Sequence, residues 1–253
     1  MKKGPLIAGC LVCLTSMAIM AMPVKAQAPG SSDKATQVSQ ILEKADILYV
    51  RKLYDDAIVE YRKALKIDPK DSVTHNKLGM AYQQLQKPGA AKKSYEQAIK
   101  LNPNYVEALN NLGTAFYALK NYNKAIRQYK KAIAIQPLFA TAFRNMGAAC
   151  FADNKFEEGF KAYTEAYRLD PAILERASTH GAPVKTGGSN QAMQYFYIAK
   201  LYASNSDMEK ALVYLEKAHE NGFADFQRVE RDSAFQGLLK NERYIRLLQT
   251  KSP

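Results

Sequence analysis

The sequence is poor in the residues that define several classes of protein. Its 253 residues include no tryptophan, three cysteines and three histidines. Three cysteines are too few for a small disulfide-stabilised scaffold, and three scattered histidines leave little material for a metal site. Glycine and proline number only 13 and 10, which excludes collagen-like and low-complexity chains. With 47% hydrophobic and 24% charged residues, the chain has the composition of an ordinary globular protein.

Motifs that carry catalysis are also missing. The sequence contains no glycine-rich phosphate loop, no Gly-x-Ser-x-Gly elbow and no His-Glu-x-x-His segment. The carboxylate pairs Asp55-Asp56 and Glu157-Glu158 stand at predicted helix starts. Negative charge there is favourable by about 0.3–1 kcal/mol each because it complements the helix dipole. We therefore predict no catalytic residue, no metal and no cofactor, and a protein that is not an enzyme.

Residues 1–26 have the pattern of a secretory signal peptide. Lys2 and Lys3 give a positive start, and a mostly apolar run extends from Leu6 to Met22. Val24-Lys25-Ala26 then supplies small residues at the spacing that a signal peptidase recognises. We predict cleavage after Ala26 and an exported protein, either periplasmic or secreted.

Two other roles for this segment stay open. The apolar run is 17 residues long, which is at the short end for an uncleaved membrane anchor. Ile7-Ala8-Gly9-Cys10 resembles a lipoprotein box, although only nine residues would precede a lipidated Cys10. Cleavage after Ala26 would remove three of the 36 basic residues and leave an excess of nine over the 24 acidic ones. It would also leave Cys150 as the single thiol, so that stability must come from packing.

A 34-residue period runs through the middle of the chain. Prolines, tyrosines, alanines and Leu-Gly pairs recur in phase, and such agreement between independent columns is the signature of a repeat architecture. The columns are Pro69, Pro103, Pro137 and Pro171; Tyr61, Tyr95, Tyr129 and Tyr163; Ala64, Ala98, Ala132 and Ala166; and Leu78-Gly79, Leu112-Gly113 and Met146-Gly147. The chain is therefore predicted to be built from copies of one structural unit.

The repeated residues resemble the tetratricopeptide repeat: a Leu-Gly pair, an aromatic residue three positions later, then alanine, an aromatic residue, alanine and proline. The resemblance covers four copies, at residues 38–71, 72–105, 106–139 and 140–173, and a degenerate fifth copy at 192–222. It implies an all-α fold, a right-handed solenoid of stacked antiparallel helix pairs with a concave inner face. Together with the signal peptide, it indicates an exported bacterial protein of this family.

The residue pattern supports the fold independently of the resemblance. Within each copy, two apolar stripes of helical period are separated by a short polar turn. Glycine and alanine let the two helices approach closely, and the tyrosine fills the space between neighbouring pairs. Proline at each boundary ends one helix where the next begins. Because a single helix pair cannot bury its apolar face, the copies must stack.

Three segments lie outside the regular copies. Residues 27–37 are predicted to be a flexible linker, and residues 174–191 to be an insertion. The insertion is expected to begin with Ile173-Leu174-Glu175-Arg176 as a helix extension and to continue as a loop that is either functional or disordered. Residues 223–253 are predicted to form C-terminal capping helices and a tail.

The concave groove is the predicted functional site. The resemblance implies that the first helix of each copy lines it, and residues at i, i+4 and i+7 share one face of a helix. The predicted partner-binding residues are Asp46, Tyr49, Asn76, Met80, Gln83, Asn110, Asn111, Thr114, Tyr117, Arg144, Asn145 and Phe151. Their amides offer a donor and an acceptor to the peptide groups of an extended ligand. For Asn111 and Asn145, bonding between neighbouring helices is an equally good interpretation.

We predict a non-enzymatic scaffold in the cell envelope that binds a peptide or protein partner in this groove. The alternative is an adaptor in envelope polysaccharide or pilus export, held through weak association of its basic surface with anionic envelope surfaces. The basic residues fall late in second helices, where the helix dipole favours them, so a solvated face also explains them. No nucleic acid is expected, because basic and aromatic residues do not interleave along a binding track.

Overall fold

The computed structural model describes residues 30–176 and 188–249, and this part of the chain is entirely helical. The predicted signal peptide, residues 27–29 of the predicted linker and residues 177–187 of the predicted insertion lie outside it. The predicted all-α fold of stacked helix pairs is confirmed. The helices are α1 (Gly30–Val50), α2 (Tyr54–Ile67), α3 (Ser72–Gln84), α4 (Pro88–Leu101), α5 (Val106–Ala118), α6 (Tyr122–Ile135), α7 (Ala140–Ala152), α8 (Phe156–Leu169), α9 (Gly188–Ser204), α10 (Met208–Glu220), α11 (Phe226–Arg231), the 3-10 helix η1 (Ser233–Leu238) and α12 (Glu242–Gln249).

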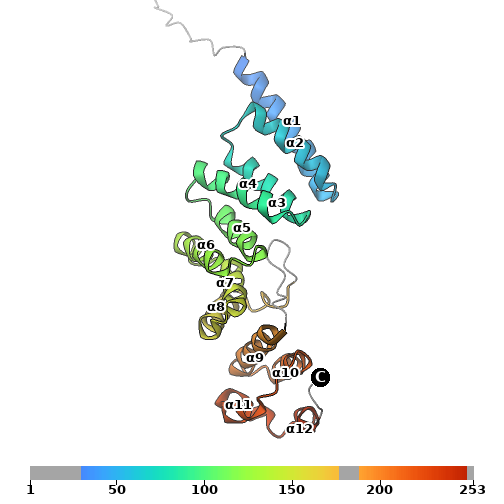
Figure 1. The fold of residues 1–253 in the computed structure, drawn as a ribbon, viewed down its shortest axis with the longest axis vertical. Helices are drawn as coiled ribbons and strands as arrows, with labels where there is room; N and C mark the ends of the chain where they lie inside the picture. Colours follow the sequence, from blue (N-terminus) through green and yellow to red (C-terminus); the bar gives the residue numbers. More distant parts are fainter. Residues whose placement is uncertain (1–29, 177–187, 250–253) are drawn as a thin grey trace, which may run out of the picture.

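The helices form pairs that stack along one long axis. Figure 1 shows the blue α1–α2 pair at one end of this axis and the orange and red C-terminal helices at the other. From α1 to α8, each helix packs against the helix before it and the helix after it. The first helices of neighbouring pairs, α3 with α5 and α5 with α7, are also in contact. The first helices therefore lie next to one another, as a groove along the stack requires.

The turn inside each pair is the same structure repeated. Its central residue has a positive φ, between 53° and 63°, although it is never glycine. In the α3–α4 turn, the amide of Gln86 donates to Gln83 and the amide of Lys87 donates to the carbonyl of Tyr82. These bonds satisfy carbonyls at the end of the first helix. The positive-φ residues are Lys52, Gln86, Lys120, Asn154 and Ser206, so the α9–α10 pair shares the turn of the regular copies.

Each boundary between regular copies stops the second helix of a pair. The residue before the proline still donates its backbone amide into the helix, as Asn102 does to Ala98 and Asp170 does to Ala166. Proline then removes the next donor and prevents the helix from continuing. The chain consequently reverses every 34 residues and begins the next first helix in the same orientation.

A tyrosine packed on a glycine joins the two helices of the pairs formed by α3 to α8. A Cβ atom placed on Gly79, Gly113 or Gly147 would lie within 2.4–2.5 Å of a ring carbon of Tyr95, Tyr129 or Tyr163. The space for a side chain on the first helix is thus already filled by the ring from the second helix. In the first pair Ala45 stands at this position, and both Ala45 and Tyr61 are fully buried. The contact sets the separation of the helices within each pair.

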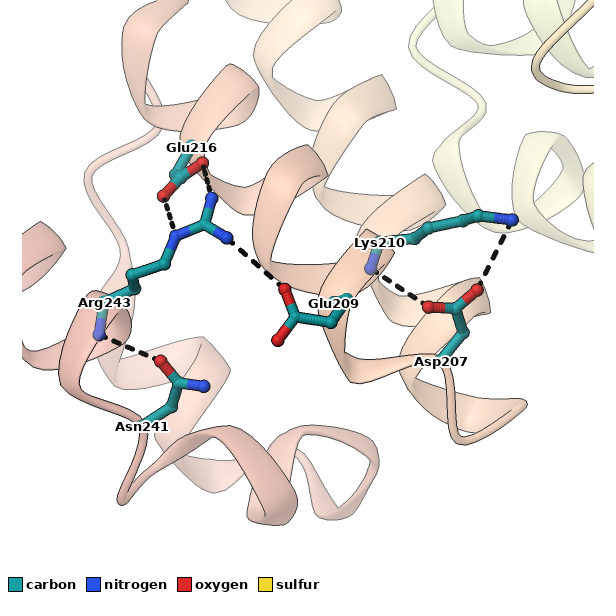
Figure 2. A network of polar contacts seen from close by, with 6 residues as sticks. All are labelled: Asp207, Glu209, Lys210, Glu216, Asn241 and Arg243. Atoms are coloured by element: carbon teal, nitrogen blue, oxygen red, sulfur yellow. Dashed lines mark hydrogen bonds and ion pairs between the residues drawn. The ribbon is translucent and has the colours of Figure 1, made fainter.

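The last pair and the C-terminal helices share one apolar core. Phe235, Leu238 and Tyr244 are buried together with Val229 and with Leu215 of α10. Arg243 at the start of α12 holds this region from outside: it donates to both carboxylate oxygens of Glu216, at 2.7 and 3.2 Å. Figure 2 shows its third nitrogen directed towards Glu209. The C-terminal helices therefore cover the apolar face that α10 would otherwise expose.

The prediction of a flexible linker is wrong for residues 30–37. Helix α1 begins at Gly30 and continues without a break to Val50, well before the first repeat was expected to start. No proline or glycine follows Gly30 within this stretch, so nothing in it stops a helix. Asp33 lies in the first turn, where the helix dipole favours negative charge.

Two predictions for the segment after the fourth copy are also wrong. Residues 171–176 form turns and do not prolong α8, because Pro171 has no amide to donate and Asp170 accepts a bond from the amide of Ala172 at 3.2 Å. The carboxylate of Asp170 also binds Arg176 at 2.6 Å and closes the turn. At the far end, residues 188–191 belong to α9 and not to a loop, since no helix breaker follows Gly188 until the helix ends.

The glycine–tyrosine contact yields a stability test with a control of opposite sign. Gly113→Ala is expected to lower the free energy of unfolding by about 1–3 kcal/mol, because the added methyl group overlaps the buried ring of Tyr129. Gly89→Ala, at an exposed position of α4 with no atom near its new Cβ, is expected to raise it by about 0.5–1 kcal/mol. Urea denaturation followed by circular dichroism measures both. Shifts of the same sign in the two variants would contradict the contact.

Candidate functional site

The largest hollow of the described chain lies across the first helices of three pairs. It has a volume of about 780 Å³. Helices α3, α5 and α7, the residues that precede α5 and α7, and the turn after α8 all contribute to it. Its lining residues are Asn76, Met80, Tyr105, Glu107, Asn110, Asn111, Phe139, Thr141, Arg144, Ile173 and Arg176.

The repeat period explains why these side chains come together. Asn76, Asn110 and Arg144 are 34 residues apart and occupy the same position in three successive first helices. Tyr105 and Phe139 hold the position just before α5 and α7, and Ile173 follows at the same interval. Since each pair repeats the geometry of the last, one position in the repeat becomes one row in the hollow. The first row is polar and the second is apolar.

Buried amides form a continuous hydrogen-bonded row on the floor of the hollow. Asn111 donates to Asn76 at 3.1 Å, and Asn145 donates to Asn110 at 3.0 Å. Asn110 and Asn111 are themselves joined at 3.4 Å. The row crosses from α3 to α7, and all four side chains are at most 6% exposed. We refer to Asn76, Asn110, Asn111 and Asn145 as the amide row. Each bond between helices satisfies groups that would be costly to bury alone.

Arg144 closes the amide row at the α7 end. Its Nη2 donates to Asn145 at 3.3 Å, and its Nη1 donates to the carbonyls of Ile173 and Arg176 at 3.5 and 3.3 Å. The residue is only 5% exposed, and its Nε has no hydrogen-bond partner. No carboxylate of the described residues forms an ion pair with it. Burial lowers the pKa of the Arg144 guanidinium, which nonetheless stays protonated because arginine titrates far above neutrality.

The rim of the hollow is partly apolar and carries opposing charges. Tyr105 and Phe139 are half-buried, and Tyr105 accepts a bond from Asn76 at 3.4 Å. Burial, and after it the charge of Glu107, raises the pKa of the Tyr105 hydroxyl. Glu107 is exposed, and Arg176 is already paired with Asp170. Arg144 is therefore the one lining charge of the hollow whose cation is both buried and unneutralised.

A smaller hollow of about 300 Å³ lies between the first two pairs. It is lined by Asp46, Tyr49, Val50, Tyr61, Lys77 and Met80. The carboxylate of Asp46 accepts from the Tyr61 hydroxyl at 2.7 Å and from Lys77 at 2.6 Å. Burial raises the pKa of the Tyr49 hydroxyl, which accepts from Gln84 at 3.5 Å. The polar groups of this hollow are thus satisfied within the chain.

The structure divides the twelve residues predicted for the groove into three sets. Five line the large hollow and two more line the smaller one. Three lie just beneath the surface: Asn145 in the amide row, Thr114 bonded to the Tyr129 hydroxyl at 3.2 Å, and Gln83 accepting from the Tyr95 hydroxyl at 3.1 Å. The seven lining residues are Asn76, Met80, Asn110, Asn111, Arg144, Asp46 and Tyr49.

Tyr117 and Phe151 were expected to contact a partner and do not line either hollow. Phe151 is fully buried between Tyr163 and Tyr197, at ring distances of 5.2 and 5.6 Å. Tyr117 is 7% exposed and packs on Tyr122, across the turn of its own pair. Both lie at the C-terminal end of a first helix, where neighbouring helices converge and close the face. The predicted stripe is therefore open only over the first turns of each helix.

Sequence reasoning missed the residues around the start of each first helix and in the turn after α8. These are Tyr105, Glu107, Phe139, Thr141, Ile173 and Arg176. The 34-residue period itself contained the signal, since Tyr105, Phe139 and Ile173 form a column of large apolar residues, as Glu107 and Thr141 form a mixed polar one. A helical-face pattern cannot detect residues that precede the helix.

The described residues offer no alternative chemistry. No group of three or more histidine, cysteine or acidic side chains within residues 30–176 and 188–249 is arranged to hold a metal. Burial raises the pKa of Cys150 to about 12, so this thiol behaves as a small apolar side chain. None of the helices in the described part is both long and apolar enough to cross a membrane.

A helical-repeat stack with a polar hollow across its first helices defines a binding scaffold. Two family models match it: a tetratricopeptide repeat model matches residues 76–138 and 113–172, and a TPR repeat model matches residues 45–86. Together the matches extend from residue 45 to 172, about half of the chain. The chain belongs to the tetratricopeptide repeat proteins, which generally act as scaffolds for protein–protein interaction and are typically not enzymes.

Solved structures share the fold at low sequence identity. MamA is 24% identical over 70% of this chain and 93% of its own, with a TM-score of 0.52. The pilF protein of Pseudomonas aeruginosa is 20% identical over 78% and 82%, with a TM-score of 0.54. YrrB, described as a TPR protein with an unusual peptide-binding site, is 19% identical over 77% and 94%, with a TM-score of 0.51. No curated protein matches the chain in sequence.

The amide row yields a second stability test. Asn145→Ala is expected to lower the free energy of unfolding by about 1–3 kcal/mol, because Asn110 and Arg144 each lose a bonding partner while buried. Gln97→Ala removes an exposed amide from α4 and is expected to change it by less than about 0.5 kcal/mol. Urea denaturation compares the two. Indistinguishable midpoints would show that the row contributes nothing to stability.

Proposed function

We propose that this protein is exported and holds an extended peptide segment of a protein partner in the hollow that crosses α3, α5 and α7. The observation that carries the proposal is the hollow itself, which combines an amide row on its floor with half-buried aromatic rings at its rim. Amides bond peptide groups, and aromatic rings pack against side chains. This is the lining expected for a peptide and not for a small charged metabolite.

The arrangement of the lining favours a ligand that lies along the stack. Equivalent residues of successive pairs present the same chemistry at regular intervals, so a chain with its own regular spacing can meet several of them. Tyr105 and Phe139 stand in equivalent positions of neighbouring pairs and offer two similar apolar contacts. Each of them is half-buried and needs no rearrangement to make such contacts.

The groove is tested by peptide selection followed by affinity measurement. A displayed library of random dodecapeptides is selected on the purified protein, and the dissociation constant of the recovered peptide is measured by fluorescence anisotropy. The double variant Tyr105→Ala/Phe139→Ala is expected to weaken binding at least about tenfold, because aromatic residues in the centre of a binding site contribute most of its energy. Thermal unfolding first verifies that the variant is folded.

The matched control for this measurement is Leu138→Ala. Leu138 is a large apolar residue directly beside Phe139, it is 72% exposed, and it does not line the hollow. Its replacement is expected to change affinity less than twofold. Full affinity in the double variant, or failure to select any peptide, would overturn the groove proposal. Binding that survives in the double variant but disappears on raising the salt concentration would support the basic-surface alternative.

Export is a separate part of the proposal and rests on Lys2, Lys3, the apolar run and the small residues that end at Ala26. The protein recovered from the envelope or medium of a bacterial host is expected to begin at Gln27, as measured by N-terminal sequencing. Ala26→Arg is expected to block this processing, since the peptidase requires a small residue there. Cys10→Ser should leave it unchanged; loss of processing in that variant would identify a lipoprotein instead.

A further inference from the structure

Arg144 is a buried cation without a counter-charge inside a hollow that is open to a ligand. Its three groups of acceptors, the carbonyls of Ile173 and Arg176 and the amide oxygen of Asn145, are all neutral. They fix the orientation of the guanidinium but do not cancel its charge. Burial of an unpaired charge costs several kcal/mol, which is why buried charges in proteins are normally paired.

The unused donor of Arg144 identifies what is missing. The guanidinium has five N–H donors in a rigid plane, and its Nε–H has no partner. A carboxylate is the acceptor that matches this plane in both shape and charge. No carboxylate from the described part of the chain supplies this match, because Asp170 is bonded to Arg176 and Glu107 is exposed at the rim.

We propose that the peptide held in the hollow places the carboxylate of a glutamate or aspartate side chain on Arg144. This inference rests on the proposed function, because it specifies the ligand of the same site. Arg144 is the one uncompensated charge among the residues that line the hollow, so a single negative group neutralises it. The exposed carboxylate of Glu107 makes a more highly charged group, such as a phosphate, less favourable there.

The depth of Arg144 indicates a side chain and not a chain terminus. The guanidinium lies on the floor, 5% exposed, below the rim formed by Tyr105 and Phe139. A glutamate side chain reaches this depth while its backbone stays at the mouth of the hollow. Its methylene groups then pass the apolar residues of the rim. A terminal carboxylate would have to bring its own backbone amide down to a floor whose amides are already bonded to one another.

The overall charge of the protein supports an acidic partner. The chain has 36 basic and 24 acidic residues, a formal charge of +12. Such an excess attracts acidic segments from a distance and raises their rate of association at low salt. The general attraction does not choose a site, whereas the unpaired Arg144 does.

Two pools of synthetic nonapeptides test the inference. Both pools are acetylated at the N-terminus and amidated at the C-terminus, and their flanking positions are randomised among apolar and small residues. They differ only in the central residue, which is glutamate in one pool and glutamine in the other. The glutamate pool is expected to bind the purified protein at least about tenfold more tightly, since truncation of a close charge pair in an interface costs that much or more.

Variants of Arg144 assign the preference to this side chain. In Arg144→Gln the two pools are expected to bind with equal affinity, and Arg144→Lys is expected to restore part of the preference. The control is Arg127→Gln, which removes an exposed arginine of α6 that lies outside the hollow. It should keep the full preference. If Arg144→Gln does not fold, the comparison of the two pools on the unmodified protein still decides the proposal.

Each outcome separates the two levels of the argument. Equal binding of both pools overturns the carboxylate proposal and leaves the groove proposal standing. Binding of neither pool by a folded protein counts against the groove itself. A glutamine pool with a free C-terminal carboxylate that binds as tightly as the amidated glutamate pool would assign Arg144 to a chain terminus and overturn the choice of a side chain. A preference that persists in Arg144→Gln would place the anion elsewhere.

Discussion

The contact between a tyrosine ring and a glycine backbone is the constraint on which the rest of the structure depends. In the pairs from α3 to α8, the ring occupies the space of the missing Cβ atom, so the two helices of a pair have one separation and one rotation. The four tyrosines of the column are fully buried, and each hydroxyl bonds a polar side chain: Asp46, Gln83, Thr114 and Gln194. A buried hydroxyl without a partner would destabilise the contact, and these bonds therefore fix the rings further.

Rigid pairs explain how a hollow forms without any residue being dedicated to it. Once the helices in each pair are fixed, a position in the repeat becomes a row of side chains spaced by one pair. The polar row of Asn76, Asn110 and Arg144 and the apolar row of Tyr105, Phe139 and Ile173 arise in this way. The bonds from Asn111 to Asn76 and from Asn145 to Asn110 then tie one pair to the next. The same amides thus hold the stack together and form the floor of its hollow, so both interpretations of Asn111 and Asn145 apply.

The periodic residues made the helix pairs and the lining by first helices predictable, because the 34-residue spacing and the glycine–tyrosine columns are local properties of the sequence. Three features were not predictable for the same reason. The start of α1 at Gly30 precedes any periodic residue, so the pattern gave no indication of it. Phe151 lies on the expected helical face but is covered by Tyr197, which is remote in the sequence and follows an interruption of the period. Tyr105 and Phe139 stand before their helices, where a face pattern does not extend.

The fourth copy departs from the second and third at the position where the departure costs most. Asn76 and Asn110 are neutral and satisfy their neighbours, and an asparagine at 144 would extend the row without burying a charge. Arginine at this position instead introduces a cation that the stack itself does not neutralise, next to the turn where the 34-residue period breaks. Stability alone therefore does not explain the residue. A hollow whose repeated rows contact any extended chain acquires, at this single break in its symmetry, a means of fixing the register and direction of one particular chain.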